Sequence, residues 1–283
     1  MRRDARGRWL TMTGRINACL MIAILAPGVC AREGWSQTGI DLSGEWQVRL
    51  DPLDEFDPEA AVASDGPMDG FATVRLPGAL RDSGLGDPVG PDTRWIGNLR
   101  PELLSRPAYR KYQVADQFKM PFWLQPNRHY VGAAYYQRDV EIPEAWRDRR
   151  VLLKMERPHW WTRVWVDHRP VGQNESLSTP HIYDLTDYVG PGRHQLTVQV
   201  DNSLRPLDVG LNSHSVSDHT QTAWHGIVGA IELHALLRPS IRNIQVVPAA
   251  DARSAGVSFK LQDWGEVQRE ATITLRVLQS GDL

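Results

Sequence analysis

One segment of the sequence combines residue types that could bind a carbohydrate. Residues 213–225 (SHSVSDHTQTAWH) are rich in hydroxyl, amide, carboxylate and imidazole groups, which can hydrogen-bond sugar hydroxyls. The indole of Trp224 could also stack on the face of a pyranose ring. The alternative is structural: the segment packs against a neighbouring domain, and Trp224 lies in the core, where an indole buries a large apolar area.

Other chemistries receive less support from the residues. His214, His219 and His225 lie five and six residues apart, whereas zinc sites usually hold tighter pairs of ligands. The sequence has no Gly-rich phosphate loop, no nucleophile elbow and no Cys/His zinc spacing, so we expect neither a metal nor another cofactor. Trp160, Trp161 and Trp165 could form an aromatic platform for sugar, but packing is the more frequent role of such residues.

Composition limits the possible classes of protein. The chain has 283 residues, of which 41% are hydrophobic and 23% charged, so it can bury a core and is not intrinsically disordered. Lys and Arg number 32 against 34 Asp and Glu, which leaves no basic excess for a nucleic-acid partner. The 23 Gly, 19 Pro and 11 Trp favour short strands and many turns.

The N-terminal residues have the layout of a secretory signal peptide. Five Arg precede the apolar run 18–26, which is too short to cross a bilayer, and Val29-Cys30-Ala31 offers small residues for cleavage after Ala31. We therefore expect an exported, periplasmic or secreted protein without a membrane anchor after cleavage, although Met12 is an alternative start. Both cysteines, Cys19 and Cys30, lie inside this signal, so the mature chain would contain no disulfide.

Period-two alternation predicts the strands that must position any site. It occurs in residues 44–50, 151–156, 194–200 and 230–236, as expected for antiparallel strands with one face toward solvent. Residues 164–172 predict a hairpin with Asp167-His168 at its tip, because both residue types tolerate positive φ. Residues 81–128 show little alternation, and an ordered connection of this length inside a domain is usually functional.

A domain boundary is expected near Leu237-Arg238-Pro239. Residues 240–247, 256–261 and 271–278 are three further strand candidates, spaced like the first strands of a β-sandwich. Three strands cannot bury both faces of a sandwich, so we expect either a fragment of a longer protein or completion by a neighbour.

Several segments, in order, resemble glycoside hydrolase family 2, which includes β-galactosidases, β-glucuronidases and β-mannosidases. The segments lie within residues 40–283, and any single one is a weak match. They are GAAYYQRDVEIP at 132–143 followed by Trp146, TRVWVD at 162–167 with Val171-Gly172, YDLT at 183–186 with Gly192, VDN at 200–202 and WHGIVG at 224–229. Leu42 to Trp46 and Leu76-Pro77-Gly78 fit the family's lead-in. Here Asp167-His168 replaces the family's usual Asn-Gly.

The resemblance implies an all-β fold in modules. Residues 32–238 would form a jelly-roll, galactose-binding-domain-like β-sandwich, and residues 239–283 the start of an incomplete immunoglobulin-like sandwich. The catalytic barrel, with both catalytic glutamates, would be absent, so the chain alone should be inactive. The family also implies that polar residues of the 213–225 loop help to bind the terminal sugar, Asp218 first and then Gln221 and His219, while Trp224 is the candidate for stacking on that sugar. On this basis we expect Asp218→Ala to impair a completed enzyme while barely changing folding.

Two other functions remain open at this point. The chain could be a stand-alone carbohydrate-binding protein, or a structural domain that docks on a separate catalytic barrel. Asn174-Glu175 resembles the family's pair of asparagine and acid/base glutamate, but it lies in the wrong module. A lone carboxylate cannot perform the two-step retaining reaction, so we expect Glu175 to lie in a solvated loop.

Overall fold

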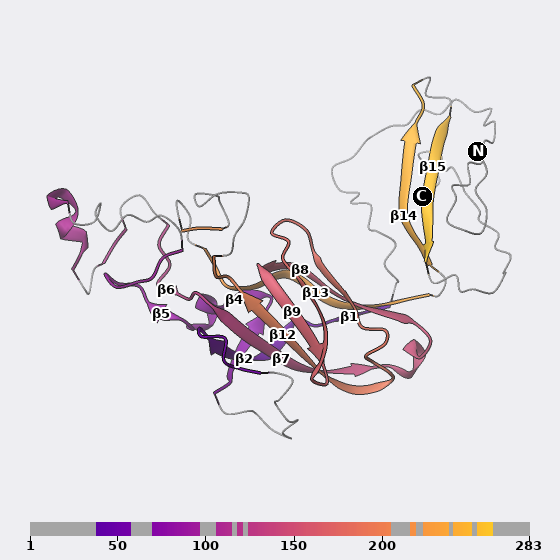
Figure 1. Cartoon of the computed structure of the whole chain (residues 1–283), viewed down its shortest axis with the longest axis horizontal. Helices are drawn as coiled ribbons and strands as arrows, with labels where there is room; N and C mark the ends of the chain where they lie inside the picture. Colours follow the sequence, from indigo (N-terminus) through magenta and orange to yellow (C-terminus); the bar gives the residue numbers. More distant parts are fainter. Residues whose placement is uncertain are drawn as a thin grey trace. The chain divides into compact units, whose positions relative to one another are not determined.

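We describe the fold from a computed structural model. The structure describes residues 38–57, 70–96, 106–114, 118–120, 124–204, 216–218, 223–237, 240–250 and 254–262. Residues 35–236 form one compact unit, and the chain from Leu237 onward belongs to another. Figure 1 shows both units, each of which is described here by itself.

The larger unit is a sandwich of two antiparallel sheets. In the first sheet the strand order is β1-β13-β8-β11, with β4 paired to β13. These strands are β1 (Gly39–Asp41), β4 (Gly78–Ala79), β8 (Arg150–His159), β11 (His181–Asp184) and β13 (Gly226–Leu236). In the second sheet the order is β10-β9-β12-β7-β2-β3. Its strands are β2 (Gly44–Asp51), β3 (Ala72–Leu76), β7 (Ala133–Ile142), β9 (Trp161–Val166), β10 (Arg169–Asn174) and β12 (Gly192–Asp201).

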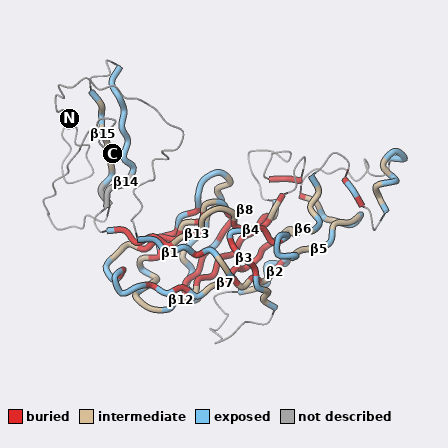
Figure 2. Tube along the Cα trace, turned by 180° about the vertical axis from the view of Figure 1, so that it is seen from behind, coloured by how far each residue is buried: buried red, intermediate tan, exposed pale blue. Residues whose placement is uncertain are grey.

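The core lies between the two sheets and follows the predicted alternation. Trp46 and Val48 of β2 are 1% exposed, and Val198 of β12 and Leu153 of β8 are fully buried. Successive side chains of a strand point to opposite faces, so every second residue enters this layer. Figure 2 shows the buried segments running along the strands of both sheets. The prediction of an all-β sandwich is confirmed.

The prediction that β12 has one face toward solvent was wrong. Thr197 and Gln199, on the face away from the core, are 2% and 0% exposed. The segment that follows β2 covers this face. Asp54 accepts a hydrogen bond of 2.6 Å from Gln199 Nε2, and the Phe56 ring packs edge-on against Tyr135 with centroids 4.7 Å apart. The polar residues are therefore buried as hydrogen-bonded pairs in a second, smaller layer.

The hairpin predicted at Asp167-His168 is confirmed. It joins β9 to β10, and φ is 47° at Asp167 and 65° at His168. Asp167 also binds the neighbouring strand, because its Oδ1 accepts a hydrogen bond of 2.8 Å from the Gln195 amide. The tip is thus anchored to β12 as well as to its own strands.

The connection between β4 and β7 contains only short elements in its described parts. These are the 3-10 helices η1 (Leu80–Ser83) and η2 (Pro107–Tyr112) and the strands β5 (Asp87–Pro88) and β6 (Arg128–His129), which pair with each other. The 3-10 helix η4 (Glu144–Trp146) follows β7. No helix among the described residues is long and apolar enough to cross a membrane.

The second unit contributes one hairpin to the described structure. β14 (Ser240–Pro248) pairs with β15 (Ala255–Gln262) in antiparallel register, which confirms two of the three strands predicted after residue 239. The third candidate, residues 271–278, lies outside the described residues.

Candidate functional site

The candidate site is built where the irregular connection meets the end of the sandwich. Strand β5 pairs with β6, and Arg128 Nη1 donates a hydrogen bond of 2.7 Å to the Gly86 carbonyl. Gly86 has a φ of +100°, and a Cβ at this position would lie 2.8 Å from the His129 carbonyl oxygen. Only glycine fits this close approach, so it fixes residues 84–88 against β6.

Asp218 joins three segments of this region through its buried carboxylate. The side chain is 0% exposed and accepts hydrogen bonds from the Ile96 amide at 2.7 Å, the Ala223 amide at 2.6 Å and His129 Nε2 at 3.0 Å. The Asp218 amide also donates to the Ile96 carbonyl at 2.8 Å. Three donors compensate the cost of burying the carboxylate, and in return it fixes the positions of Ile96 and His129.

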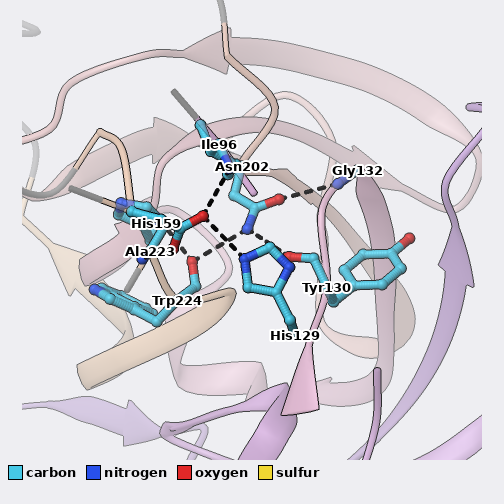
Figure 3. Close-up of polar contacts among 9 residues, drawn as sticks. Ile96, His129, Tyr130, Gly132, His159, Asn202, Ala223 and Trp224 are labelled. Carbon is cyan, nitrogen blue, oxygen red and sulfur yellow. Dashed lines mark hydrogen bonds and ion pairs between the residues drawn. The ribbon is translucent and has the colours of Figure 1, made fainter. Parts of the chain in front are cut away.

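Asn202 makes a second set of contacts beside the first (Figure 3). It follows β12 and is fully buried. Its Oδ1 accepts a hydrogen bond of 3.0 Å from the Gly132 amide, and its Nδ2 donates to the carbonyls of Tyr130 at 2.9 Å and Trp224 at 3.4 Å. A single amide side chain therefore holds the 130–132 segment beside the start of β13.

His225 is the buried polar residue at the start of β13. Its Nε2 lies 3.1 Å from the Gly132 carbonyl oxygen and 3.0 Å from that of Val200, while Nδ1 is 3.2 Å from the Tyr136 hydroxyl. Carbonyl oxygens only accept, so Nε2 carries the hydrogen and Nδ1 accepts from Tyr136. Burial lowers the pKa of His225 to about 4, which keeps the imidazole neutral.

These contacts shape a groove of about 1130 Å³. It is lined from the end of β2 and the turn after it, from residues 84–96 and 128–132, and by Ser203 and Leu204. The volume slightly exceeds the usual range of about 300–1,000 Å³ for small-molecule sites and is sufficient for a monosaccharide. The residues that the sequence marked as an ordered, irregular connection therefore form much of this groove.

The groove mixes aromatic, basic and hydroxyl groups. Trp95 and His129 lie side by side in its lining, with ring centroids 4.9 Å apart and planes at 59°. Burial raises the pKa of the Tyr130 phenol, which is neutral and hydrogen-bonded to the Asp51 amide. The described carboxylates that line the groove are Asp87 and Asp92, and both are exposed. Such a surface can bind polar hydroxyls and an apolar ring face.

The four residues chosen from sequence have different outcomes. Asp218 and Trp224 lie beside the groove but not in its described lining, while His219 and Gln221 lie outside the described residues. Trp224 is half-buried and stacks on His159, with centroids 4.7 Å apart. Sugar contact by these residues stays a prediction.

Other candidates take structural positions. Trp160, Trp161 and Trp165 are 0%, 4% and 5% exposed, so packing is their role in the sandwich. Glu175 is exposed after β10, as expected for a solvated loop. No group of three His, Cys, Asp or Glu side chains within the described part of the chain is placed to hold a metal ion.

Sequence reasoning missed His129, Trp95 and Asn202 as members of the site. His129 and Asp218 are 89 residues apart in the chain, and no local pattern links them. Asn202 carried a signal, since it closes the VDN segment of the family resemblance.

Comparison with known proteins decides the family. Residues 40–236 match the family described as "Glycosyl hydrolases family 2, sugar binding domain". The chain belongs to glycoside hydrolase family 2. The matched residues are those of the sandwich, so the groove and its buried polar contacts lie within this family's sugar-binding domain.

Similar family 2 proteins include β-glucuronidases and a β-galactosidase. The chain is 24% identical to the β-glucuronidase of Canis lupus familiaris over 73% of its own length and 27% of that protein. It is 22% identical to the β-galactosidase large subunit of Leuconostoc lactis over 83% of its length and 36% of that protein. The chain therefore spans about a third or less of these relatives.

A solved family 2 structure supports the fold. The β-glucuronidase of Faecalibacterium prausnitzii superposes with a TM-score of 0.52 at 18% identity, covering 80% of this chain and 36% of that one. At this identity the likeness concerns the fold alone.

Proposed function

We propose that this chain is the sugar-recognition part of a glycoside hydrolase and binds a β-linked glycoside in the groove. The observation that carries the proposal is the groove itself, lined by Trp95, His129, Tyr130 and Arg128 within the residues that match a sugar-binding domain. An aromatic face beside a few fixed polar groups is the usual composition of a small-molecule site.

The proposal assigns bond cleavage to a catalytic module beyond these residues. Retaining cleavage requires two carboxyl groups about 5–5.5 Å apart, one of them enclosed so that it can act as an acid. Asp87 and Asp92 in the groove are both exposed, and Asp218 is fully buried behind it. The relatives named glucuronidase and galactosidase extend well beyond the shared part, which supports the same division of roles.

Ligand-observed saturation-transfer NMR tests binding with methyl β-D-glucuronide and methyl β-D-galactoside, chosen from the names of the relatives. We expect signal transfer to at least one glycoside at millimolar concentration, and no release of nitrophenol from the matching nitrophenyl glycosides. If neither glycoside shows signal transfer, the binding role is contradicted. Sustained turnover by the purified chain would contradict the assignment of catalysis to another module.

We also propose that the protein is exported. The basic front, the apolar run 18–26 and the small residues before Arg32 support this proposal. The mature protein should begin at Arg32, which N-terminal sequencing of material from the culture medium or periplasm would reveal. Recovery of cytoplasmic protein that retains residues 1–31 would contradict export.

A further inference from the structure

We infer that His129 is the groove's hydrogen-bond acceptor for a hydroxyl of a pyranoside, and that Asp218 is the residue that positions it. The inference rests on the proposed function and names the residue pair that would recognise the sugar. It follows from the two nitrogens of one imidazole, which have different surroundings.

The first nitrogen is fixed by Asp218. His129 Nε2 lies 3.0 Å from Asp218 Oδ2, and the imidazole and carboxylate side chains are only 5% and 0% exposed. The Asp218 carboxylate accepts, so Nε2 carries a hydrogen and donates it. In the neutral imidazole this leaves the lone pair on Nδ1, because the hydrogen-bond partner of one ring nitrogen decides which of the two nitrogens carries the hydrogen.

The second nitrogen, Nδ1, has a different environment. Among the residues that the structure describes, none hydrogen-bonds Nδ1 of His129. Nδ1 is also not one of the buried side-chain atoms that lack a partner, so it has accessible surface. Since His129 lines the groove, a ligand hydroxyl there can donate to Nδ1. A buried imidazole with one engaged and one accessible nitrogen is a preorganised acceptor.

Trp95 indicates the class of ligand. Its indole lies 4.9 Å from the His129 ring and lines the same groove. A pyranoside offers an apolar face of C–H groups for the indole and hydroxyls at its edge for the imidazole. Asp218 cannot replace His129 in this contact without cost, because the Ile96 and Ala223 amides also use its carboxylate.

A matched pair of variants separates the two nitrogens. In His129→Gln the side-chain NH2 group can occupy the place of Nε2 and keep the bond to Asp218, but the acceptor at Nδ1 is lost. In His129→Asn the amide oxygen lies near the place of Nδ1, but the bond to Asp218 is lost. We expect His129→Gln to fold with nearly normal stability and to bind the methyl glycoside about fivefold more weakly or worse. We expect His129→Asn to keep an acceptor but to lose stability and to bind more weakly than the unaltered chain, because Asp218 no longer positions that acceptor.

Nitrogen NMR of the unaltered chain provides a readout that does not depend on a variant. Addition of the methyl glycoside that binds should move the Nδ1 resonance of His129 toward that of a hydrogen-bonded acceptor, while Nε2 stays nearly constant. Unchanged binding by His129→Gln, or a stationary Nδ1 resonance at saturation, would overturn the inference and leave the proposed function intact. Failure of the unaltered chain to bind either glycoside would overturn the proposed function itself.

Discussion

Asp218 accepts three hydrogen bonds inside the protein, which sets its expected contribution to stability. Asp218→Ala would leave two backbone amides and an imidazole without their acceptor. Each unsatisfied buried donor costs about 1–3 kcal/mol, so we expect the free energy of unfolding to fall by about 3 kcal/mol or more. This replaces the expectation from sequence that the substitution barely changes folding.

Urea unfolding measures this loss, with Asp148→Ala as the control. Asp148 is exposed in the turn after η4, so its replacement should change stability by less than about 0.5 kcal/mol. An equally small effect at position 218 would show that the three contacts contribute little.

His225 makes stability depend on pH in a defined window. Its pKa is lowered to about 4 by burial, and burial lowers the pKa of His181 as well. Between the ordinary value of about 6.5 and pH 4, the unfolded chain takes up a proton at residue 225 that the folded chain does not. Acidification across this window therefore favours unfolding, by up to about 1.4 kcal/mol per pH unit for His225.

Proton NMR of the imidazole, combined with unfolding at several pH values, checks this prediction. The His225 ring should stay neutral until the pH approaches 4, and His225→Gln should show a smaller pH dependence of stability. A His225 ring that titrates near pH 6.5 in the folded protein would contradict the burial argument.

At the residue scale the sequence identifies chemical types but not partners. The polar 213–225 segment pointed to the region where Asp218, Trp224 and His225 now lie together with Asn202 and His129. The long-range contacts could not be predicted, because they depend on where β6 and β12 end and β13 begins in space.

At the scale of elements, Gly226 determines how β13 pairs with β4. Its φ is +147°, and a Cβ would lie 2.3 Å from the Gly78 carbonyl oxygen and 2.9 Å from Ala79 Cα. Both contacts involve backbone, which cannot move without disrupting the pairing. We expect Gly226→Ala to lower the free energy of unfolding by about 2 kcal/mol or more.

Gly172→Ala is the matched control for thermal or urea unfolding. Gly172 lies in β10, and the nearest atom to an added Cβ is Tyr183 Cε1 at 4.0 Å. Its replacement should change stability by less than about 1 kcal/mol. Equal effects at the two positions would show that the close approach of β4 and β13 is not required.

The burial of a strand was predictable from its alternating apolar and polar residues where only the packing of the two sheets buries it. Trp46 and Val48 of β2 and Val151, Leu153 and Met155 of β8 are buried as expected, because one face of each sheet meets the other sheet, while Leu50 is only partly buried. β12 was misjudged on its outer face, since the segment after β2 covers Gln199 and Thr197 pairs with Gln137 of β7. When an irregular segment from elsewhere in the chain covers a strand, the sequence of that strand contains no periodic pattern that would predict the cover.

At the scale of the whole molecule, we propose that recognition and cleavage belong to different modules. The sandwich positions a groove with fixed polar groups, and the carboxylates in its described lining, Asp87 and Asp92, are both exposed. The chain covers 27% and 36% of two relatives, a glucuronidase and a galactosidase. Family membership and the sandwich were predictable from short segments that occur in the family's order. The groove was not, because it depends on how residues 84–96 and 128–132 are placed in space.

Amide NMR spectra of the purified chain, recorded during titration with methyl β-D-glucuronide and then methyl β-D-galactoside, test the central claim most directly. We predict that at least one glycoside causes saturable shifts concentrated in residues 84–96 and 128–132, with little change in β14 and β15. Spectra that stay unchanged at tens of millimolar of both glycosides, or shifts centred away from these residues, would contradict it.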